Sequence, residues 1–283
     1  SSWKAYAPAH AGKLAIEAVD RVMRGEGAPS PIYEGEDSVI ARMLDGKKAL
    51  YKIPLPKKNE EKKAILETYT KEYSAEYQAQ ALIDIAKKIK KKINNLNQIK
   101  KIDIYTSHHT HYVIGTGAND PQKMDPNSSR ETLDHSIMYI FAVALEDGKW
   151  HHIKSYTKSR AKRKSTIKIW RVIKTHEDKK WTKKYHDPNP KNKSFGAKAI
   201  VTLKNGRKII ESLNRADAHP YGARPFKKNN YINKFLILTK NIISKKESDK
   251  FLNNVQKIKK LKSSQLYKLN IEVKKSYLKR NKK

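Results

Sequence analysis

Apolar residues recur at helical spacing in three separate parts of the chain. The first predicted helix has an apolar face made of Leu14, Ala15, Ala18, Val19 and Val22. The second has Ala75, Ala79, Leu82, Ile83, Ala86 and Ile89 on one face and lysines at positions 87–92 on its wet side. Prolines and glycines interrupt residues 29–56, where we expect a short helix at 38–43 and an extended piece at 49–53. From Tyr231 onward the pattern is helical again.

Between the second and third helical parts, the pattern alternates with a period of two. Ile102, Ile104 and Thr106 predict a strand that leads into a histidine-rich run. Residues 199–203 and 209–211 flank an Asn-Gly dipeptide, which predicts a β-hairpin with a type I′ turn. Between these strands we expect short helices in the basic stretch 155–173.

A buried helix is expected from Leu133 to Ala144. Residues 128–131 provide a capping box for it, and the Asp134-His135 pair then falls in its first turns. The order of elements, helical then mixed then helical, is typical of an α+β domain inserted into a helical one. We therefore predict part of a large all-helical domain at residues 1–66, a smaller α+β domain at 67–228, and helices returning to the helical domain at 229–283. Residues 273–283 read as a basic tail.

The net charge of +34 changes this picture less than its size suggests. Only 11 of the 62 basic residues are arginine, whereas base and phosphate recognition favours the arginine fork. Lysine on solvated faces accounts for the excess, so we expect no specific nucleic-acid partner. A basic module that binds nucleic acid or an anionic surface is kept as an alternative.

Several kinds of site and location are excluded by residue type. Without cysteine the chain can hold no disulfide, thiolate zinc site or cysteine-bound iron–sulfur cluster. The longest apolar run, residues 137–145, falls short of the roughly 20 residues that span a bilayer, and no signal segment opens the chain. We expect a soluble cytoplasmic protein without a membrane partner. Because the chain opens on Ser1 and soon enters a helix, we also expect an N-terminal part to be missing.

Polar chemistry is concentrated between residues 107 and 145, where histidines, a Gly-rich turn and an Asp-His pair lie beside an apolar helix. This density indicates an enzyme site. Three runs, Ser107–Tyr139, Trp181–Pro188 and Ala216–Phe226, closely resemble the MmgE/PrpD family and occur in family order. The similarity extends over nearly the whole chain.

The resemblance implies a fold and an activity. The fold is a large all-helical domain with a smaller α+β domain, in a cytoplasmic homodimer without metal or other cofactor. The reaction is that of a hydro-lyase, which dehydrates the tricarboxylate 2-methylcitrate to 2-methyl-cis-aconitate in propionate catabolism, the methylcitrate cycle. Citrate or aconitate are further substrates of relatives, and a cis-aconitate-decarboxylase-like enzyme is the alternative within the fold. Family chains extend further at the N-terminus, and several site residues of the related cis-aconitate decarboxylase, including an aspartate, a threonine and histidines, would lie there.

Two lysines match site lysines of the decarboxylase branch. Lys4 precedes the first helix and Lys71 the second, and we assign both to catalysis, with Lys71 stabilising the negative charge that develops on the substrate. Glu76 replaces a histidine of the decarboxylase pattern, which favours the dehydratase. Its predicted role is general acid/base, or simply a favourable charge in a first helical turn.

The remaining candidates are mostly histidines. On a strand His109 and His111 share one face, which suggests a metal pair, but no third ligand accompanies them. We assign both, with Tyr112, to substrate binding, and structural hydrogen bonding is the alternative. His135 is a candidate for proton transfer, and Arg224 for clamping a carboxylate or for a domain junction.

The Gly-rich stretch after the histidines does not indicate a cofactor site. Residues 115–117 read Gly-Thr-Gly and lack both the third glycine and the strand–helix context of a dinucleotide site. We interpret them as a turn and expect neither a nicotinamide cofactor nor a metal.

Overall fold

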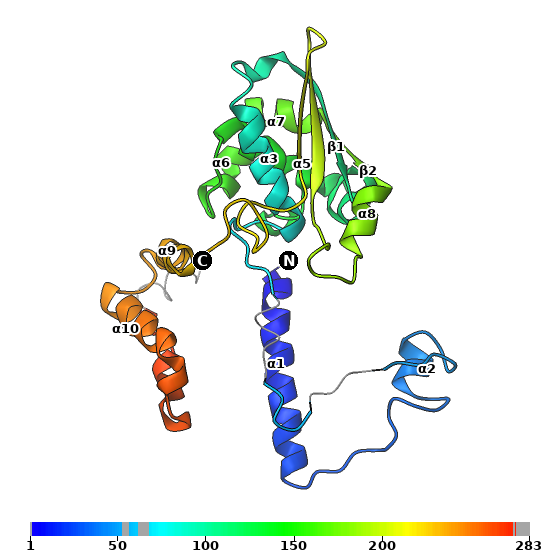
Figure 1. Ribbon diagram of the computed structural model, residues 1–283, viewed down its shortest axis with the longest axis vertical. Coiled ribbons are helices and arrows are strands. Elements are labelled where there is room, and N and C mark those ends of the chain that lie inside the picture. Colours follow the sequence, from blue (N-terminus) through cyan, green and yellow to red (C-terminus); the bar gives the residue numbers. More distant parts are fainter. Residues whose placement is uncertain (1, 53–56, 62–67, 274, 276–283) are drawn as a thin grey trace. The chain divides into compact units, whose positions relative to one another are not determined.

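The computed structural model describes residues 2–52, 57–61, 68–273 and 275, with side chains from residue 6 onward. The chain divides into two compact units, Ser1–Thr68 and Tyr69–Lys283 (Figure 1). In the first unit the predicted helices are present as α1, Ser2–Met23, and α2, Val39–Met43. Ser38 begins α2 by accepting a hydrogen bond from the Ala41 N–H at 3.2 Å. Residues 49–52 carry no regular structure, and Ile53 lies outside the described residues.

The second unit is built on a four-stranded mixed sheet. Its strands are β1, Ile99–Thr106; β2, Ile173–Glu177; β3, Ala197–Leu203; and β4, Lys208–Leu213, in the order β2-β1-β3-β4. β1 pairs parallel with β2 and antiparallel with β3, which forms the hairpin with β4. The predicted strand and hairpin are confirmed, as is the α+β class.

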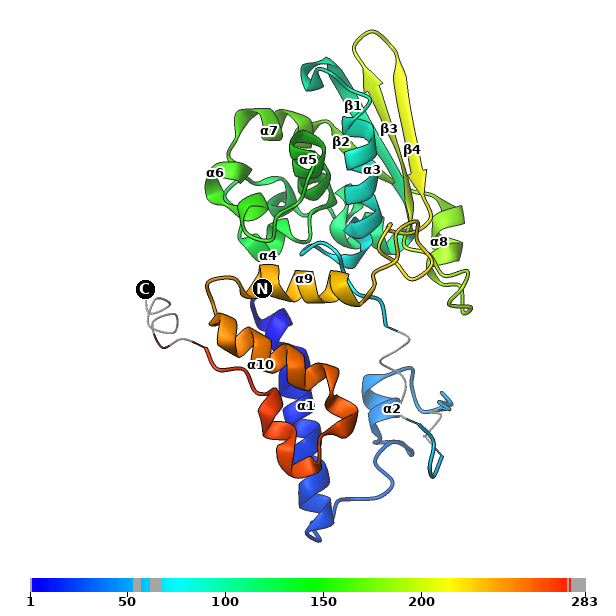
Figure 2. The same cartoon turned by 60° about the vertical axis from the view of Figure 1, so that its left-hand side comes forward.

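Two helices cover one face of this sheet and bury its core. α3, Gln80–Lys90, and α5, Ile137–Asp147, pack on each other and on the strands (Figure 2). Residues 137–145 are all buried in α5, which ends at Gly148 with a φ of 65°. At roughly 25 cal/mol per Å² of apolar surface, this burial is the main force that holds the layers together.

The helix predicted from Leu133 to Ala144 is two helices. α4 covers Arg130–Leu133, and α5 begins again after Ser136. The Ser136 hydroxyl donates to the Lys123 carbonyl at 2.7 Å and accepts from the Tyr139 N–H at 3.2 Å, so it starts a new helix. The Asp134-His135 pair therefore lies in the junction and not in the first turns of one helix.

The basic stretch forms short helices as predicted. They are a 3-10 turn at Lys154–Tyr156, α6 at Lys158–Ala161 and α7 at Lys164–Arg171. Two elements after them were not predicted, namely β2 and α8, Lys179–Tyr185, which contacts β1. In Figure 1, α8 lies on the side of the sheet away from α3.

The turn of the hairpin differs from the prediction. In the loop only Gly206 has a positive φ, 86°, whereas a type I′ turn needs two such residues. The Gly206 N–H donates to the Leu203 carbonyl at 3.0 Å. A turn followed by a left-handed glycine is usual in hairpin loops longer than the two-residue loop of a type I′ turn.

Helices close the described chain, as the pattern predicted. They are α9, Lys228–Thr239, and α10, Lys245–Gln256, followed by 3-10 turns at Ile258–Lys260 and Ser263–Leu269. No α9 side chain is buried. The assignment of residues 1–66 and 229–283 to a larger helical domain stays a prediction. Most of the predicted tail, residues 274 and 276–283, lies outside the described residues.

Candidate functional site

The segment from Lys71 to Glu76 has its backbone fixed from inside its own unit. The buried amide of Gln80 at the start of α3 accepts from the Tyr73 N–H at 3.0 Å. The same amide donates to the carbonyls of Tyr73 at 3.1 Å and Ala75 at 3.2 Å. It also lies 3.3 Å from the Glu76 carbonyl, so four bonds from one side chain satisfy backbone groups of a segment that is neither helix nor strand.

Distant side chains hold the same segment from the other side. The Ser74 carbonyl accepts from Trp150 Nε1 at 3.3 Å and from the Tyr156 hydroxyl at 2.7 Å. Tyr156 also lies 2.6 Å from Asp134 Oδ1, and burial and the Asp134 charge raise the pKa of its hydroxyl. The junction that carries His135 is thereby linked to the segment that carries Lys71.

Two cations lie against the start of this segment. Arg224 Nη2 contacts both carboxylate oxygens of Glu72, at 3.0 and 2.9 Å. Lys234 on α9 donates its ammonium to the Lys71 carbonyl, and burial together with the Lys71 charge lowers the pKa of Lys234. The Arg224 pairing uses only Nη2, so Glu72 does not occupy the rest of the guanidinium.

A cavity of about 350 Å³ opens at this place. Its walls include Glu72, Arg224 and Lys234, together with the neighbouring His151 and His152. The two histidine rings stack with centroids 4.5 Å apart. Two fixed cations beside one carboxylate, with imidazoles next to them, make a pocket suited to a small polyanion.

The predicted catalytic residues lie at different distances from this cavity. Lys71 is exposed and adjoins the cavity-lining Glu72. Glu76 accepts from the Gln78 N–H at 2.5 Å and begins the 3-10 turn Tyr77–Ala79, so its observed contact is the helix-start role. Lys4 lies inside α1, which corrects the prediction that it precedes the first helix, and its side chain is outside the described residues.

His135 has its ring orientation set by a backbone group. Nδ1 lies 3.0 Å from the Glu131 carbonyl, which can only accept, so Nδ1 carries the proton. In the neutral ring Nε2 then holds the lone pair that a general base needs. The adjacent Asp134 is 3.6 Å from the same Nδ1 and is not the group that sets the tautomer.

The histidines after β1 do not lie on a strand, which corrects the prediction that His109 and His111 share a strand face. The strand ends at Thr106, and a π-helical turn covers Thr110–Ile114. Ser107 causes this change of direction, because its hydroxyl accepts from the Thr110 N–H at 3.3 Å. His109 stacks on Tyr185 of α8, with ring centroids 5.3 Å apart.

His111 is packed into the Gly-Thr-Gly turn. Its Nδ1 is 2.7 Å from Thr175 Oγ1 on β2, and burial together with the His176 charge lowers its pKa. A Cβ added at Gly117 would lie 2.5 Å from the His111 ring, so the glycine is needed to seat this ring. Tyr112 beside it is 48% exposed, with its ring centroid 4.5 Å from that of His111. His109, His111 and Tyr112 are not among the residues that line the cavity of Arg224.

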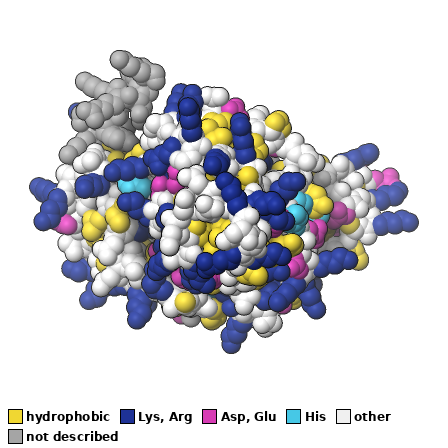
Figure 3. All heavy atoms as spheres, turned by 90° about the horizontal axis from the view of Figure 1, so that it is seen from above, with side chains coloured by type: hydrophobic (Ala, Val, Ile, Leu, Met, Phe, Trp, Pro, Cys, Tyr) yellow, Lys and Arg dark blue, Asp and Glu magenta, His cyan; other side chains and the backbone are white. Residues whose placement is uncertain are grey.

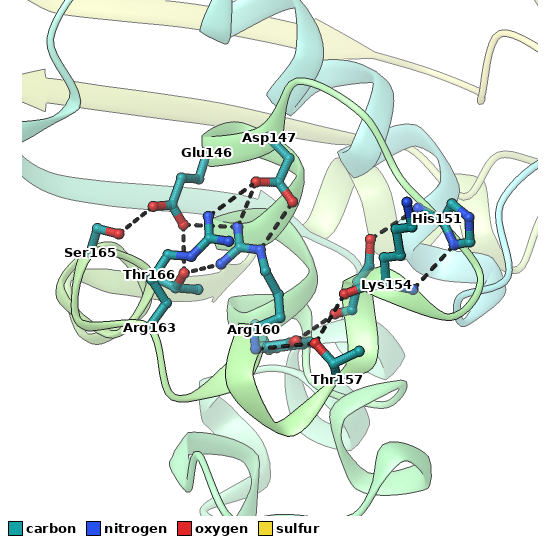
Figure 4. Close-up of polar contacts among 11 residues, drawn as sticks. Glu146, Asp147, His151, Lys154, Thr157, Arg160, Arg163, Ser165 and Thr166 are labelled. Carbon is teal, nitrogen blue, oxygen red and sulfur yellow. Dashed lines mark hydrogen bonds and ion pairs between the residues drawn. The ribbon is translucent and has the colours of Figure 1, made fainter.

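One buried charge cluster in the unit is structural. Arg160 is 4% exposed and pairs with Glu146 at 2.8 Å and Asp147 at 3.0 Å (Figure 4). Burial alone would raise the pKa of Glu146, but hydrogen bonds from Ser165 and Thr166 and the Arg160 charge lower it. The cluster is satisfied by its own members, and neither Arg160 nor its two carboxylate partners line the cavity.

Apart from Arg224, the charged and imidazole residues that line the cavity were missed by the sequence patterns. His151 and His152 belong to no motif, and Lys234 is one of 51 lysines. Among the described residues no three His, Asp or Glu side chains gather as a metal site would require. The described part of the chain contains no helix long and apolar enough to cross a bilayer. Figure 3 shows basic side chains spread over the face in view, with acidic and apolar ones between them.

Residues 73–260 match the family model of the MmgE/PrpD C-terminal domain. The match covers more than half of the 283-residue chain. It includes Glu76, the histidine run after β1, His135 and Arg224, whereas Lys4 and Lys71 lie before it.

Proposed function

Because the chain belongs to the MmgE/PrpD family, whose members are generally hydro-lyases, we propose that it dehydrates 2-methylcitrate to 2-methyl-cis-aconitate. The observation that carries this proposal is the cavity at the Lys71–Glu76 segment, with Arg224 and Lys234 in its walls. A tricarboxylate brings about three negative charges, which need cations and N–H donors in a shielded site. A cytoplasmic homodimer is part of the same proposal.

The reaction requires three groups. A base removes the proton from the carbon that bears the methyl group and a carboxylate, and the electron pair forms the double bond to the neighbouring carbon. The hydroxyl on that carbon leaves, takes up a proton and departs as water. Lys71 stabilises the charge that develops on the carboxylate, and His135, with its lone pair on Nε2, suits the proton transfer.

A lysine variant tests the proposal. In the full-length protein, Lys71→Met should lower turnover by at least about a hundredfold, the scale of losing one oriented charge stabiliser. Turnover is followed by the ultraviolet absorbance of the new conjugated alkene, and Lys204→Met in the exposed hairpin loop is the matched control. Stability should hardly change, because Lys71 is exposed.

Two results would contradict the proposal in different ways. Near wild-type turnover of a folded Lys71→Met variant would remove Lys71 from the site. Absence of any absorbance rise with 2-methylcitrate or citrate in the folded wild-type protein would refute the activity itself.

A further inference from the structure

The tautomer of His151 is fixed by its own loop. Nδ1 accepts two backbone N–H groups, from Ile153 and Lys154, each at 3.1 Å. A backbone N–H can only donate, so Nδ1 must hold the lone pair of the ring. The proton of the neutral imidazole is therefore on Nε2.

The loop also fixes the direction of the ring. The His151 N–H donates to Ser155 Oγ at 2.9 Å, and the Ser155 N–H donates back to the His151 carbonyl at 3.2 Å. The buried hydroxyl of Tyr139 donates to the Ser155 carbonyl at 2.5 Å and ties the loop to α5. Figure 4 shows the ring held against the backbone of the Lys154 turn.

Charging this ring is unfavourable. A proton on Nδ1 would break both backbone bonds and leave two N–H groups without their acceptor. Burial and the charges of His152, Lys154 and Lys149 lower the pKa of His151 in the same direction. At neutral pH the ring offers one N–H and no free lone pair, which makes it a donor and not a base.

We propose that His151 binds a carboxylate of a di- or tricarboxylate anion in the cavity, as a neutral Nε2–H donor that acts together with Arg224 and Lys234. All three residues line the same cavity, and Nε2 is the ring's remaining polar atom once Nδ1 is engaged. The inference rests on the proposed function for its class of ligand. It assigns His151 to substrate binding, and leaves proton transfer to other groups.

Citrate binding to the full chain, measured by calorimetry, tests this assignment. His151→Leu should weaken citrate binding roughly tenfold or more, because it removes a hydrogen bond to a charged group. His151→Gln keeps an N–H near the position of Nε2 and should stay within about threefold of the wild type. His186→Leu, at an exposed histidine outside the cavity, is the control and should bind citrate as the wild type does.

Nitrogen-15 NMR of the histidine rings provides a second, independent measurement on the wild-type protein. The His151 ring should show its proton on Nε2 at neutral pH, and the Nε2 resonance should shift when citrate is added. A proton on Nδ1, a charged ring, unchanged citrate affinity of His151→Leu, or no citrate binding by the wild type would each overturn the inference. If citrate binding depends on His151 but 2-methylcitrate is not dehydrated, the activity fails and the binding role stands.

Discussion

Protonation of His219 should destabilise the second unit. The ring is 4% exposed, and its Nδ1 accepts the Tyr221 N–H at 3.0 Å. Its centroid lies 4.5 Å from that of Tyr69. A proton on Nδ1 would remove that acceptor and place a charge in a buried site beside Arg215. Burial and the Arg215 charge accordingly lower the pKa of His219 from 6.5 to about 4.

The sign and size of the effect follow from that shift. Between pH 6.5 and about 4 the unfolded chain binds a proton that folded His219 does not, so stability falls as the pH falls through this window. The contribution is fully present above pH 6.5. Since one pKa unit corresponds to about 1.4 kcal/mol, the loss at the acid end approaches about 3 kcal/mol.

A difference measurement isolates this residue. The free energy of unfolding is measured with urea across the window for the wild type and for His219→Asn, whose amide oxygen can accept the Tyr221 N–H but does not titrate there. Other groups, such as His111 and His151, titrate in both proteins and cancel in the difference. His186→Asn controls for the loss of an exposed histidine. If wild type and His219→Asn lose stability in parallel, the argument is wrong.

Two further substitutions test the packing. Arg160→Met should cost about 3–5 kcal/mol in urea unfolding, because it leaves two partly buried carboxylates without their partner; a loss below about 1 kcal/mol would mean that the cluster is not a coupled unit. Gly117→Ala should cost about 1–3 kcal/mol, because its Cβ would meet the His111 ring at 2.5 Å. Gly12→Ala, in α1 with nothing within 4 Å, is the control, and equal effects of the two alanines would contradict the seating of His111.

The elements that could be predicted are those whose pattern is local. In α3 and β1 the apolar period marks residues that the structure buries, such as Leu82, Ile83, Ile102 and Ile104. Burial in α3 extends beyond the predicted face, because residues 80–86 are all buried. The hairpin was found for the same reason, from the Asn-Gly dipeptide between two alternating runs. Its turn type was wrong, because Asn-Gly also serves longer loops.

The errors arise where a contact distant in sequence decides the local structure. The break between α4 and α5 depends on the Lys123 carbonyl that accepts from Ser136, thirteen residues later. β2 is short and becomes a strand because it pairs with β1, and five residues carry too little pattern to show this. The turn that ends β1 has a local cause in Ser107. Serine is also compatible with a longer strand, so the sequence alone did not show the turn.

The candidate site was predictable in its residue types and not in its geometry. The family resemblance pointed to Lys71, the adjacent Asp134 pointed to His135, and the ability to clamp a carboxylate pointed to Arg224. In the structure Arg224 contacts Glu72, and Tyr156 links Asp134 to Ser74. His151 could not have been selected, since its role depends on two backbone N–H groups that its own loop turns toward it. Nothing in a pair of adjacent histidines indicates that geometry.

Many side chains bond to the backbone around Ser74, and these bonds lower the entropy cost of binding at this segment. A lysine side chain loses up to about 2 kcal/mol of rotamer entropy when it is held in one conformation. If the backbone of Lys71 also moved, a further cost of about 1–2 kcal/mol per residue would be added at the moment of binding. The Lys234 ammonium holds the Lys71 carbonyl, and Gln80, Trp150 and Tyr156 hold residues 73–75. This part of the backbone cost is therefore met before a ligand binds. If Lys71 meets the substrate as proposed, the aromatic residues beside the cavity contribute to binding indirectly, by holding the backbone that follows this lysine.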